Sequence, residues 1–314
     1  MRFVQFYGAL AAISGVSAQQ IYLGFNSGAT NDKNEAKSEA DFEKDVRLYS
    51  NIQRFTTDTP IEAFAAAVKT NTSLLLGIWC SGTDSIENEL SASNRTIDQY
   101  GSSFTDLVMG ISVGSEDLYR VSETRDVLRD TPLSDIPVGH VDAWSAWVNS
   151  SNEVLIEAVD FVGVDIYPYY EDNLGNDISN ASTIFNDLLN RTETAAGNKP
   201  VWVTETGWPT TGPKWGNAEP SVENAKTFWD EVGCRLFGRT NTWYYILRDS
   251  NPDNTMKFAL DPELDSKPAY NLTCPAGAGA PAAVNTQLSN GAASAIPGPS
   301  AMIFGLLAAL TLAV

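Results

Sequence analysis

Eight short apolar runs recur along the chain, and helical or polar stretches separate them. The runs are almost continuously apolar, without the alternation of apolar and polar residues that marks a strand with one wet face. This pattern is typical of parallel strands that are covered on both faces. The predicted strands are Ile21–Phe25, Val46–Ser50, Ser73–Trp79, Asp106–Gly114, Ile136–Trp144, Val159–Pro168, Pro200–Trp208 and Thr242–Leu247.

Two of the intervening stretches carry clear helix signals. After Ser221, apolar residues keep a helical spacing from Val222 to Leu236, and Gly238 closes the segment. Another helix is predicted to start at Thr59-Pro60, where a capping residue precedes a proline at the first helical position. Strands that alternate with helices within one domain predict an α/β fold, a single-domain (β/α)8 TIM barrel. An open doubly wound sheet is the alternative.

The first 18 residues predict a secretory signal peptide. They hold one early cation, Arg2, then an apolar middle, and end in the small residues Val16-Ser17-Ala18 before Gln19. The alternative is an N-terminal helix buried in the fold. We expect the folded domain of the mature protein to span residues 19–275.

The other end of the chain predicts a lipid anchor. Residues 276–290 form a linker rich in Ala, Gly, Ser and Pro, and an uncharged apolar tail ends the segment 291–314. Small residues at Asn290-Gly291-Ala292 before a short spacer and such a tail indicate a glycosylphosphatidylinositol (GPI) signal, with Asn290 as the attachment site. A C-terminal transmembrane anchor is the alternative. We therefore expect the mature protein outside the cell, in the cell wall and at the outer face of the plasma membrane. We also expect it to be a monomer.

The acidic composition argues against nucleic acid as a partner. Residues 19–290 contain 19 basic and 39 acidic residues, a net charge of −20, and such a surface repels phosphate backbones. Sequons for N-glycosylation agree with a secreted route, and they stand at Asn71, Asn94, Asn149, Asn180, Asn190 and Asn271.

The scarcity of histidine and cysteine narrows the possible chemistry. The single histidine, His140, cannot build a multi-histidine zinc site and is expected to be a structural residue in an apolar strand. Phosphate-binding and nucleophile-elbow motifs are absent from the sequence, so no metal and no organic cofactor is expected. A disulfide between Cys234 and Cys274 is favoured because it would pin the C-terminal segment to the preceding helix, which leaves Cys80 as a buried thiol. If the chain is an enzyme, its acids and bases are carboxylates.

Two glutamates stand where a barrel places its catalytic groups. Catalytic residues of such barrels lie at the C-terminal ends of the strands, and Glu116 and Glu205 follow the fourth and seventh predicted strands. Aromatic residues ring the same strand ends. Opposed carboxylates beside flat aromatic faces are what glycoside cleavage requires, because one must protonate the leaving oxygen while the other attacks or activates water.

Five motifs carry a family resemblance. The segments "GFNSGAT", "SVGSEDLYR", "VGHVDAWSAWV", "VDFVGVDIYPYY" and "KPVWVTETGWPTTG" resemble glycoside hydrolase family 17, in its fungal branch of GPI-anchored endo-β-1,3-glucanases. The resemblance extends from about Ile21 to Pro275 and implies a retaining mechanism on β-1,3-glucan. It implies that Glu116 is the general acid/base and Glu205 the nucleophile.

The roles of the two glutamates lead to further expectations. Glu205 must be ionised to attack, and Arg47 at the end of the second strand is placed to support its charge. A retaining enzyme holds its two carboxyl groups about 5–5.5 Å apart. The predicted substrate-binding residues are Arg47, Tyr49, Tyr119, Asp165, Tyr167, Trp208 and Asp249, with Tyr169 and Tyr170 as further candidates for sugar contacts. Gly207 is interpreted as room for a closely approaching sugar, and Trp208 as a stacking wall. Trp229 and Phe228 lie on the helical stripe and are expected in the core.

Two connections look shorter than those of the family that the chain resembles. The first joins predicted strands one and two through "NDKNEAKSEADFEKD", and the second joins strands four and five. Each gap is about the size of a helix or part of one. A barrel that lacks helical cover exposes apolar surface, so the two shortened connections bear on stability and activity.

The resemblance implies cleavage of internal β-1,3-glucosidic bonds of fungal wall glucan, with retention and a role in wall remodelling. A β-1,3-glucan transglycosylase would use the same two glutamates and is one alternative. An inactive glucan-binding wall protein is the other.

Overall fold

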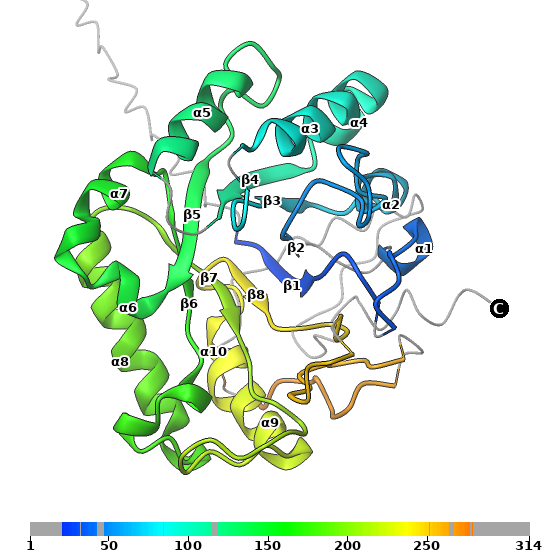
Figure 1. The fold of residues 1–314 in the computed structure, drawn as a ribbon. Coiled ribbons are helices and arrows are strands. Elements are labelled where there is room, and N and C mark those ends of the chain that lie inside the picture. Colours follow the sequence, from blue (N-terminus) through cyan, green and yellow to red (C-terminus); the bar gives the residue numbers. More distant parts are fainter. Residues whose placement is uncertain are drawn as a thin grey trace, which may run out of the picture.

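The structure is a computed structural model that describes residues 21–31, 33–42, 47–83, 85–114, 118–250, 252–263, 267–276 and 278, with only the backbone of residues 118 and 119. In this part of the chain the strands close into a parallel barrel in the order β1 to β8, which confirms the predicted TIM-barrel class (Figure 1). The strands are β1 (Leu23–Ser27), β2 (Arg47–Leu48), β3 (Leu74–Ile78), β4 (Val108–Val113), β5 (Val138–Ala143), β6 (Val162–Asp165), β7 (Val201–Thr206) and β8 (Thr242–Tyr244).

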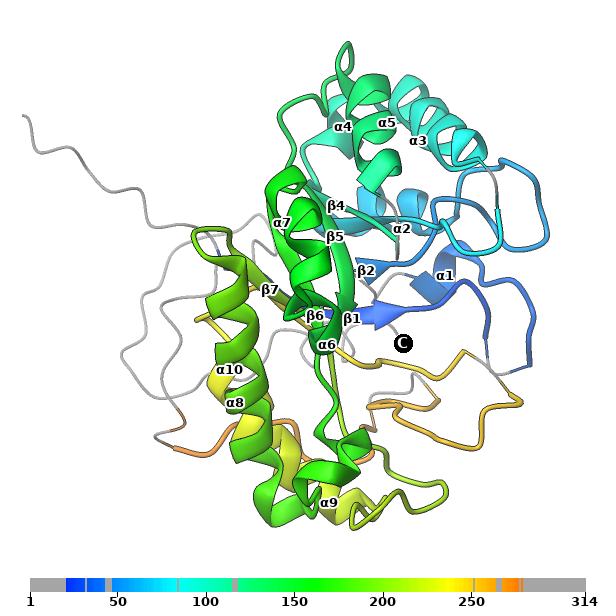
Figure 2. The same ribbon diagram turned by 60° about the vertical axis from the view of Figure 1, so that its left-hand side comes forward.

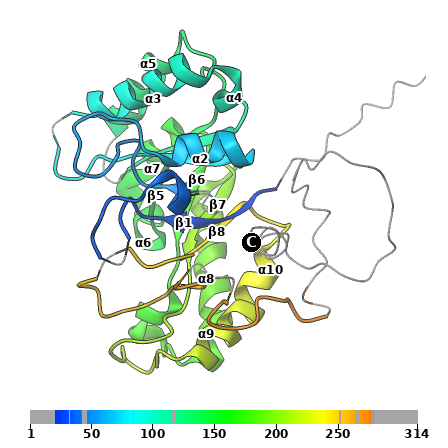
Figure 3. The ribbon, with the colours of Figure 1, turned by 90° about the vertical axis from the view of Figure 1, so that its right-hand side faces the viewer.

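Helices surround the strands on most sides (Figure 2). The α-helices are α1 (Glu39–Phe42), α2 (Ala63–Thr70), α3 (Glu87–Tyr100), α4 (Ser102–Thr105), α5 (Leu118–Leu128), α6 (Trp144–Trp147), α7 (Glu153–Ala158), α8 (Ile178–Ala196), α9 (Val222–Phe228) and α10 (Cys234–Leu236). Shorter turns are η1 (Ser150–Asn152), η2 (Pro168–Tyr170), η3 (Asp172–Leu174) and the π-helical η4 (Trp229–Gly233). Figure 3 shows α3, α4 and α5 at one end of the molecule and α8 and α9 at the other.

Four large side chains fill the lower part of the barrel. Leu75, Phe161, Trp202 and Trp243 form a buried cluster, in which the rings of Phe161 and Trp202 stack with their centroids 3.7 Å apart. Gly139 makes room for this cluster, because a Cβ atom there would lie 2.5 Å from the Phe161 ring. The interior of the barrel is therefore filled by side chains, and a catalytic site can lie only at the mouth of the barrel.

The side of the barrel beside β1 and β8 has little helical cover. Helix α1 is a single turn that buries Phe42, and it stands in the first of the two connections that the sequence marks as short. The chain after β8 folds back along itself instead, since the N–H of Leu260 donates to the carbonyl of Ile246. Met256, Phe258 and Leu260 from this segment are buried. Of these residues, Phe258 packs against Tyr167, with the two ring centroids 5.8 Å apart. The second connection carries the eleven-residue helix α5.

One predicted helix start is wrong. Helix α2 begins at Ala63, and its N-cap residue Glu62 makes no capping hydrogen bond with its side chain. Pro60 does not occupy the first helical position, because it forms an isolated bridge with Ile52. Backbone pairing between these two loop segments therefore outweighs the local Thr-Pro signal.

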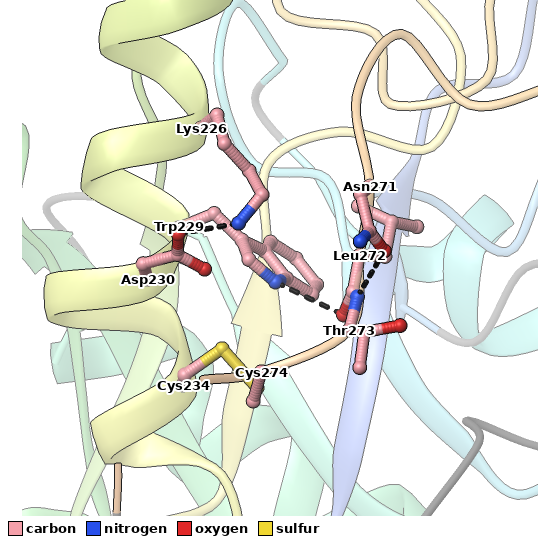
Figure 4. The surroundings of a disulfide bond; sticks show 8 residues. All are labelled: Lys226, Trp229, Asp230, Cys234, Asn271, Leu272, Thr273 and Cys274. Carbon is pink, nitrogen blue, oxygen red and sulfur yellow. Dashed lines mark hydrogen bonds and ion pairs between the residues drawn. A yellow bond between two sulfur atoms is a disulfide. The ribbon is translucent and has the colours of Figure 1, made fainter. Parts of the chain in front are cut away.

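The predicted helix after Ser221 is present as α9, η4 and α10 in succession. The Ser221 hydroxyl caps it by accepting from the N–H of Asn224. Phe228 and Trp229 are buried in the core, as expected. Cys234 and Cys274 form a disulfide with a Cα–Cα distance of 5.5 Å, the pairing that the sequence favours. Figure 4 shows the bridge beside the indole N–H of Trp229, which donates to the carbonyl of Leu272. The disulfide and this hydrogen bond therefore both fix the C-terminal segment to the helical segment after Ser221.

Several predictions fall on residues outside the described ranges. They concern the signal peptide, most of the linker, the GPI signal with Asn290, and the side chains of Glu116 and Tyr119. Of the sequons, those at Asn71, Asn149, Asn190 and Asn271 are exposed, whereas Asn94 and Asn180 are half-buried. None of the described helices combines the length and the apolar character needed to cross a bilayer.

His140 and Cys80 are both structural. His140 is fully buried, its Nδ1 lies 2.7 Å from the carbonyl oxygen of Val113, and its ring packs edge-on against Trp147. Cys80 is a buried thiol whose Sγ donates to the carbonyl of Ile78. Neither residue takes part in the arrangement around Glu205.

Candidate active site

A register shift in β7 sets the position of Glu205. Val164 of β6 pairs with Val203, and the next residue, Asp165, pairs with Glu205, so Thr204 is the extra residue. The pairing with β8 shifts over the same residues. Irregularities of this kind re-aim side chains at the rims of barrels. Here the shift lets Thr204 contact Asp165 while Glu205 reaches the mouth.

Glu205 accepts hydrogen bonds from three side chains. Its Oε1 accepts from Arg47 Nη1 at 2.9 Å and from the hydroxyl of Tyr49 at 2.7 Å. Its Oε2 accepts from the hydroxyl of Tyr167 at 2.8 Å. The donors come from the ends of β2 and β6, on different sides of the mouth. Both carboxylate oxygens are therefore oriented, while 14% of the side chain stays exposed.

Further hydrogen bonds fix the position of the Arg47 side chain beside Glu205. The residue is 3% exposed, and its Nη1 also donates to the side-chain oxygen of Asn26 and to the carbonyl of Thr204. Asn26 in turn donates to the carbonyls of Thr204 and Trp243. This buried amide was not among the predicted site residues, although it stands at the end of the first strand. Its position there is the signal that could have identified it.

The electrostatics around Glu205 keep the two phenols that donate to it neutral. Burial lowers the pKa of the Arg47 guanidinium, but the acidic groups of Tyr49 and Glu205 outweigh burial and raise that pKa. Burial and then the charge of Glu205 raise the pKa of both Tyr49 and Tyr167 well above the ordinary value of a tyrosine. Both hydroxyls consequently keep their protons and remain donors.

Asp165 lies behind Glu205 and is not bonded to it directly. The Thr204 hydroxyl donates to its Oδ1 at 2.7 Å. Burial, followed by the charge of Glu205, raises the pKa of Asp165 well above its ordinary value. Asp165 therefore binds a proton more readily than an exposed aspartate, which limits the repulsion that a second carboxylate would exert on Glu205.

Tyr245 belongs to the site and was missed by the sequence analysis. Its ring packs edge-on against Tyr167 at 5.8 Å and against Phe258 at 5.3 Å. Burial and then the charge of Glu205 raise its pKa. The residue stands inside the apolar run "TWYYIL", and nothing local in that run separates a tyrosine at the mouth from one in the core.

Two predicted sugar contacts beside Glu205 are wrong. Trp208 is 1% exposed, and its ring packs edge-on against Tyr169, which is itself buried, so it offers no free face for stacking. The indole N–H of Trp208 donates to the carbonyl of Glu219. Gly207 does not make room for a sugar either, since a Cβ atom there would lie 2.5 Å from the carbonyl oxygen of Tyr245. The Trp208 ring therefore points into the interior and away from the mouth.

Asp249 holds the loop that follows β8. Its two oxygens accept from the backbone N–H groups of Phe258 and Ala259 at 3.1 and 3.2 Å. Burial raises its pKa. The predicted contact between Asp249 and substrate stays a prediction, and what the structure gives is a role in positioning Phe258 next to Tyr167.

The second predicted catalytic carboxylate, Glu116, lies just beyond the end of β4. The described chain reaches Gly114, whose N–H donates to the carbonyl of Ile78, and resumes in α5. The expected separation of about 5–5.5 Å between the two carboxyl groups stays a prediction. The described residues contain no group of three or more His, Cys, Asp or Glu that could hold a metal ion.

A closed parallel barrel with a carboxylate oriented at its mouth is the architecture of many glycoside hydrolases, and comparison with known proteins places the chain among them. Residues 22–259 match the sequence pattern of the BtgE/BtgC glycoside hydrolase domain. The chain belongs to this family, which confirms the resemblance to family 17 that its motifs indicate.

Curated fungal proteins and solved structures are similar to the chain. It is 43% identical over 302 residues to a probable glucan endo-1,3-beta-glucosidase of Aspergillus oryzae, covering 84% of this chain and 65% of that protein. A protein of the same name from Aspergillus niger is 41% identical, covering 85% and 66%. The chain thus spans slightly less than two thirds of these relatives. The crystal structure of the family 17 beta-1,3-glucanosyltransferase of Rhizomucor miehei has a TM-score of 0.63 at 22% identity, covering 81% of this chain and 98% of that one. At that identity the likeness extends to the fold alone.

Proposed function

We propose that the protein hydrolyses internal β-1,3-glucosidic bonds of glucan and retains the configuration at the anomeric carbon. The observation that carries the proposal is Glu205, oriented by Arg47, Tyr49 and Tyr167 at the mouth of a glycoside hydrolase barrel. The names of the fungal relatives support β-1,3-glucan as the substrate class.

In the first step Glu205 is the nucleophile. One carboxylate oxygen forms a bond to the anomeric carbon while the bond from that carbon to the leaving oxygen breaks. The electron pair stays on the leaving oxygen, and Glu116 supplies the proton that neutralises it. The product of this step is a glycosyl ester of Glu205 and a shortened glucan.

In the second step water replaces Glu205 at the anomeric carbon. Glu116, now ionised, takes a proton from the water as it attacks, and the carboxylate of Glu205 leaves. Arg47, Tyr49 and Tyr167 stabilise the returning negative charge, since they hold donors at the positions where it develops. The same three donors therefore assist both steps.

We further propose that the mature protein acts outside the cell. The proposal is supported by the predicted signal peptide and GPI signal, the exposed sequons and the disulfide between Cys234 and Cys274. Attachment through a lipid at Asn290 would keep the barrel close to wall glucan, where cleavage could remodel the wall.

Product analysis on a soluble β-1,3-glucan tests the activity. Recombinant protein is expected to release reducing ends and oligosaccharides shorter than the substrate, whereas the Glu205→Gln variant releases none. Products longer than an oligosaccharide substrate would instead identify a transglycosylase. Glucan binding by the wild type without any release of reducing ends would identify a wall-binding protein.

A further inference from the structure

A surface hollow of about 370 Å³ lies between α6 and α8, on the outside of the barrel. Figure 1 shows the two helices beside each other. The residues that line the hollow are Val148, Asn190, Arg191, Thr194 and Ala195. A hollow of this volume is large enough for one small organic ligand. The side chains that donate to Glu205 stand at the ends of β2 and β6, so the hollow takes no part in the proposed cleavage.

The lining combines an aliphatic surface with a cation that is held in place. Val148 and Ala195 are half-buried aliphatic residues. The guanidinium of Arg191 lies over the ring of Trp144, 4.8 Å or less from its centroid at 4.6 Å. The Thr194 hydroxyl donates to the backbone carbonyl of its own helix. Such a lining suits a ligand with apolar C–H groups and oxygen acceptors, which describes a sugar ring that carries an acetamido group.

One residue of the lining can carry a sugar covalently. Asn190 opens the sequon Asn190-Arg191-Thr192, and its side chain is exposed, so its amide nitrogen is accessible. Thr192 is fully buried, and its hydroxyl donates to the carbonyl of Leu188 at 3.0 Å. Glycosylation of a secreted chain takes place during its translocation, before Thr192 becomes buried. The fold is therefore compatible with a glycan on Asn190.

A second helical sequon has the same setting. Asn94 in α3 opens the sequon Asn94-Arg95-Thr96. Thr96 is fully buried, and its hydroxyl donates to the carbonyl of Ala92 at 2.8 Å. A hollow of about 380 Å³ is lined by Asn94, Ile97, Asp98, Asp130, Thr131 and Pro132. Two asparagines that can carry a glycan therefore each stand at a hollow of similar size, which points to the attached sugar as the occupant.

We propose that Asn190 carries an N-linked glycan and that the first N-acetylglucosamine of this glycan packs in the hollow between α6 and α8. Asn190 Nδ2 forms a bond to the anomeric carbon of the sugar, while the bond from that carbon to a phosphate oxygen of a lipid-diphosphate donor breaks. The electron pair stays on the diphosphate, and the amide loses one proton. The apolar face and the acetamido methyl group of the sugar cover Val148 and Ala195, and Arg191 donates to a sugar oxygen.

The consequence is that the first sugar stabilises the packing of α6 against α8. The inference rests on the proposed location outside the cell, because only a secreted chain meets the glycan donor. A group that binds the folded state alone raises its stability, and covalent attachment keeps the sugar at a high effective concentration beside the hollow.

Secretion of the full chain from a yeast host tests the inference. Mass spectrometry of peptides is expected to find a glycan on Asn190. Asn190→Gln is expected to lower the melting temperature by about 2–4 °C and to speed hydrogen exchange in α6 and α8. Endoglycosidase H leaves the first N-acetylglucosamine in place, so the trimmed wild type is expected to melt at the same temperature as the untrimmed protein.

Two controls separate the sugar from the side chain. Ser151→Ala removes the sequon at Asn149, which does not line the hollow, and is expected to leave the melting temperature unchanged. When both are produced without glycans in a bacterial periplasm, the wild type and Asn190→Gln are expected to melt at the same temperature.

Two results would overturn the inference. One is an unmodified Asn190 in a chain whose other sequons carry glycans, and the other is equal melting temperatures for the glycosylated wild type and Asn190→Gln. A chain without any glycan would refute the proposed location together with the inference. A glycosylated wild type that is stabilised through Asn190 but does not cleave glucan would refute only the proposed hydrolysis.

Discussion

At the scale of single residues, the site depends on how many donors hold one carboxylate. Glu205 is contacted by one cation and two phenols, of which Arg47 and Tyr49 stand at the end of β2 and Tyr167 beyond the end of β6. In the proposed mechanism, a carboxylate held in this way keeps a fixed orientation toward the anomeric carbon and is stabilised when it leaves again in the second step.

Replacing either phenol should therefore slow turnover. We expect Tyr49→Phe and Tyr167→Phe each to lower kcat about 10- to 100-fold, because each removes one hydrogen bond to a charged group. Initial rates on soluble β-1,3-glucan check this, with Tyr100→Phe on α3 as the control. Rates within about twofold of the wild type for both variants would show that the two hydroxyls do not assist Glu205.

Glu89 on α3 makes stability depend on pH. Its carboxylate is buried and accepts from the Ser50 hydroxyl and from the N–H of Asn51, immediately after Tyr49. Burial raises the pKa of Glu89 from 4.5 to about 7. As the pH rises, Glu89 therefore loses its proton at a lower pH in the unfolded chain than in the folded protein. The stability that Glu89 contributes is fully present below about pH 4.5 and is lost as the pH rises through about 7, a loss of about 3 kcal/mol.

Urea unfolding at about pH 5 and about pH 8 measures this effect. Glu89→Gln cannot ionise, so the free energy of unfolding of this variant is expected to fall less between the two values than that of the wild type. Glu87→Gln, at an exposed position on the same helix, serves as the control. An equal fall in all three proteins would rule out Glu89 as the source.

Sequence reasoning located residues whose position follows from the whole fold, and it failed where the position depends on how two connections pack. Arg47 was placed beside Glu205 because parallel strands bring their C-terminal ends to one rim, a property of the whole fold. Trp208 was misplaced because its ring turns inward after the strand, onto Tyr169. That turn depends on packing between two connections, which no local pattern records.

At the scale of elements, the pattern of apolar runs predicted which strands exist better than it predicted where each strand begins and ends. Every predicted run contains or overlaps a strand, because continuous apolar runs follow from burial on both faces. Of the predicted strand Val46–Ser50, only Arg47–Leu48 form β2. Of the predicted strand Thr242–Leu247, only Thr242–Tyr244 form β8. The shift in β7 that aims Glu205 is invisible in the sequence, since it arises from pairing with both neighbours.

The cap of α9 offers a test at this scale. Ser221→Ala removes the hydroxyl that accepts from the N–H of Asn224 and should lower the free energy of unfolding by about 1 kcal/mol. Ser221→Asp keeps an oxygen acceptor and should retain the stability of the wild type. Chemical unfolding curves give both values, and equal stability of the alanine variant would contradict the assigned cap.

At the scale of the whole molecule, the C-terminal segment is fixed to the barrel by a covalent link. The disulfide joins residues 40 positions apart, so its loss frees a long loop in the unfolded chain. We expect Cys234→Ser/Cys274→Ser to lower the free energy of unfolding by about 4 kcal/mol. Unfolding curves without reductant check this, with Cys80→Ser reporting the effect of losing a thiol elsewhere. A double variant as stable as the wild type would contradict the stabilising role.

The central claim for the whole molecule is that Glu205 forms a covalent bond to the sugar. A laminaribioside with fluorine at C2 and a good leaving group slows the second step, so the glycosyl ester accumulates and can be located by mass spectrometry of peptides. We expect the label on Glu205, in the peptide that contains "VTETGWP", and none in the Glu205→Gln variant. An active enzyme labelled on another residue would contradict the account.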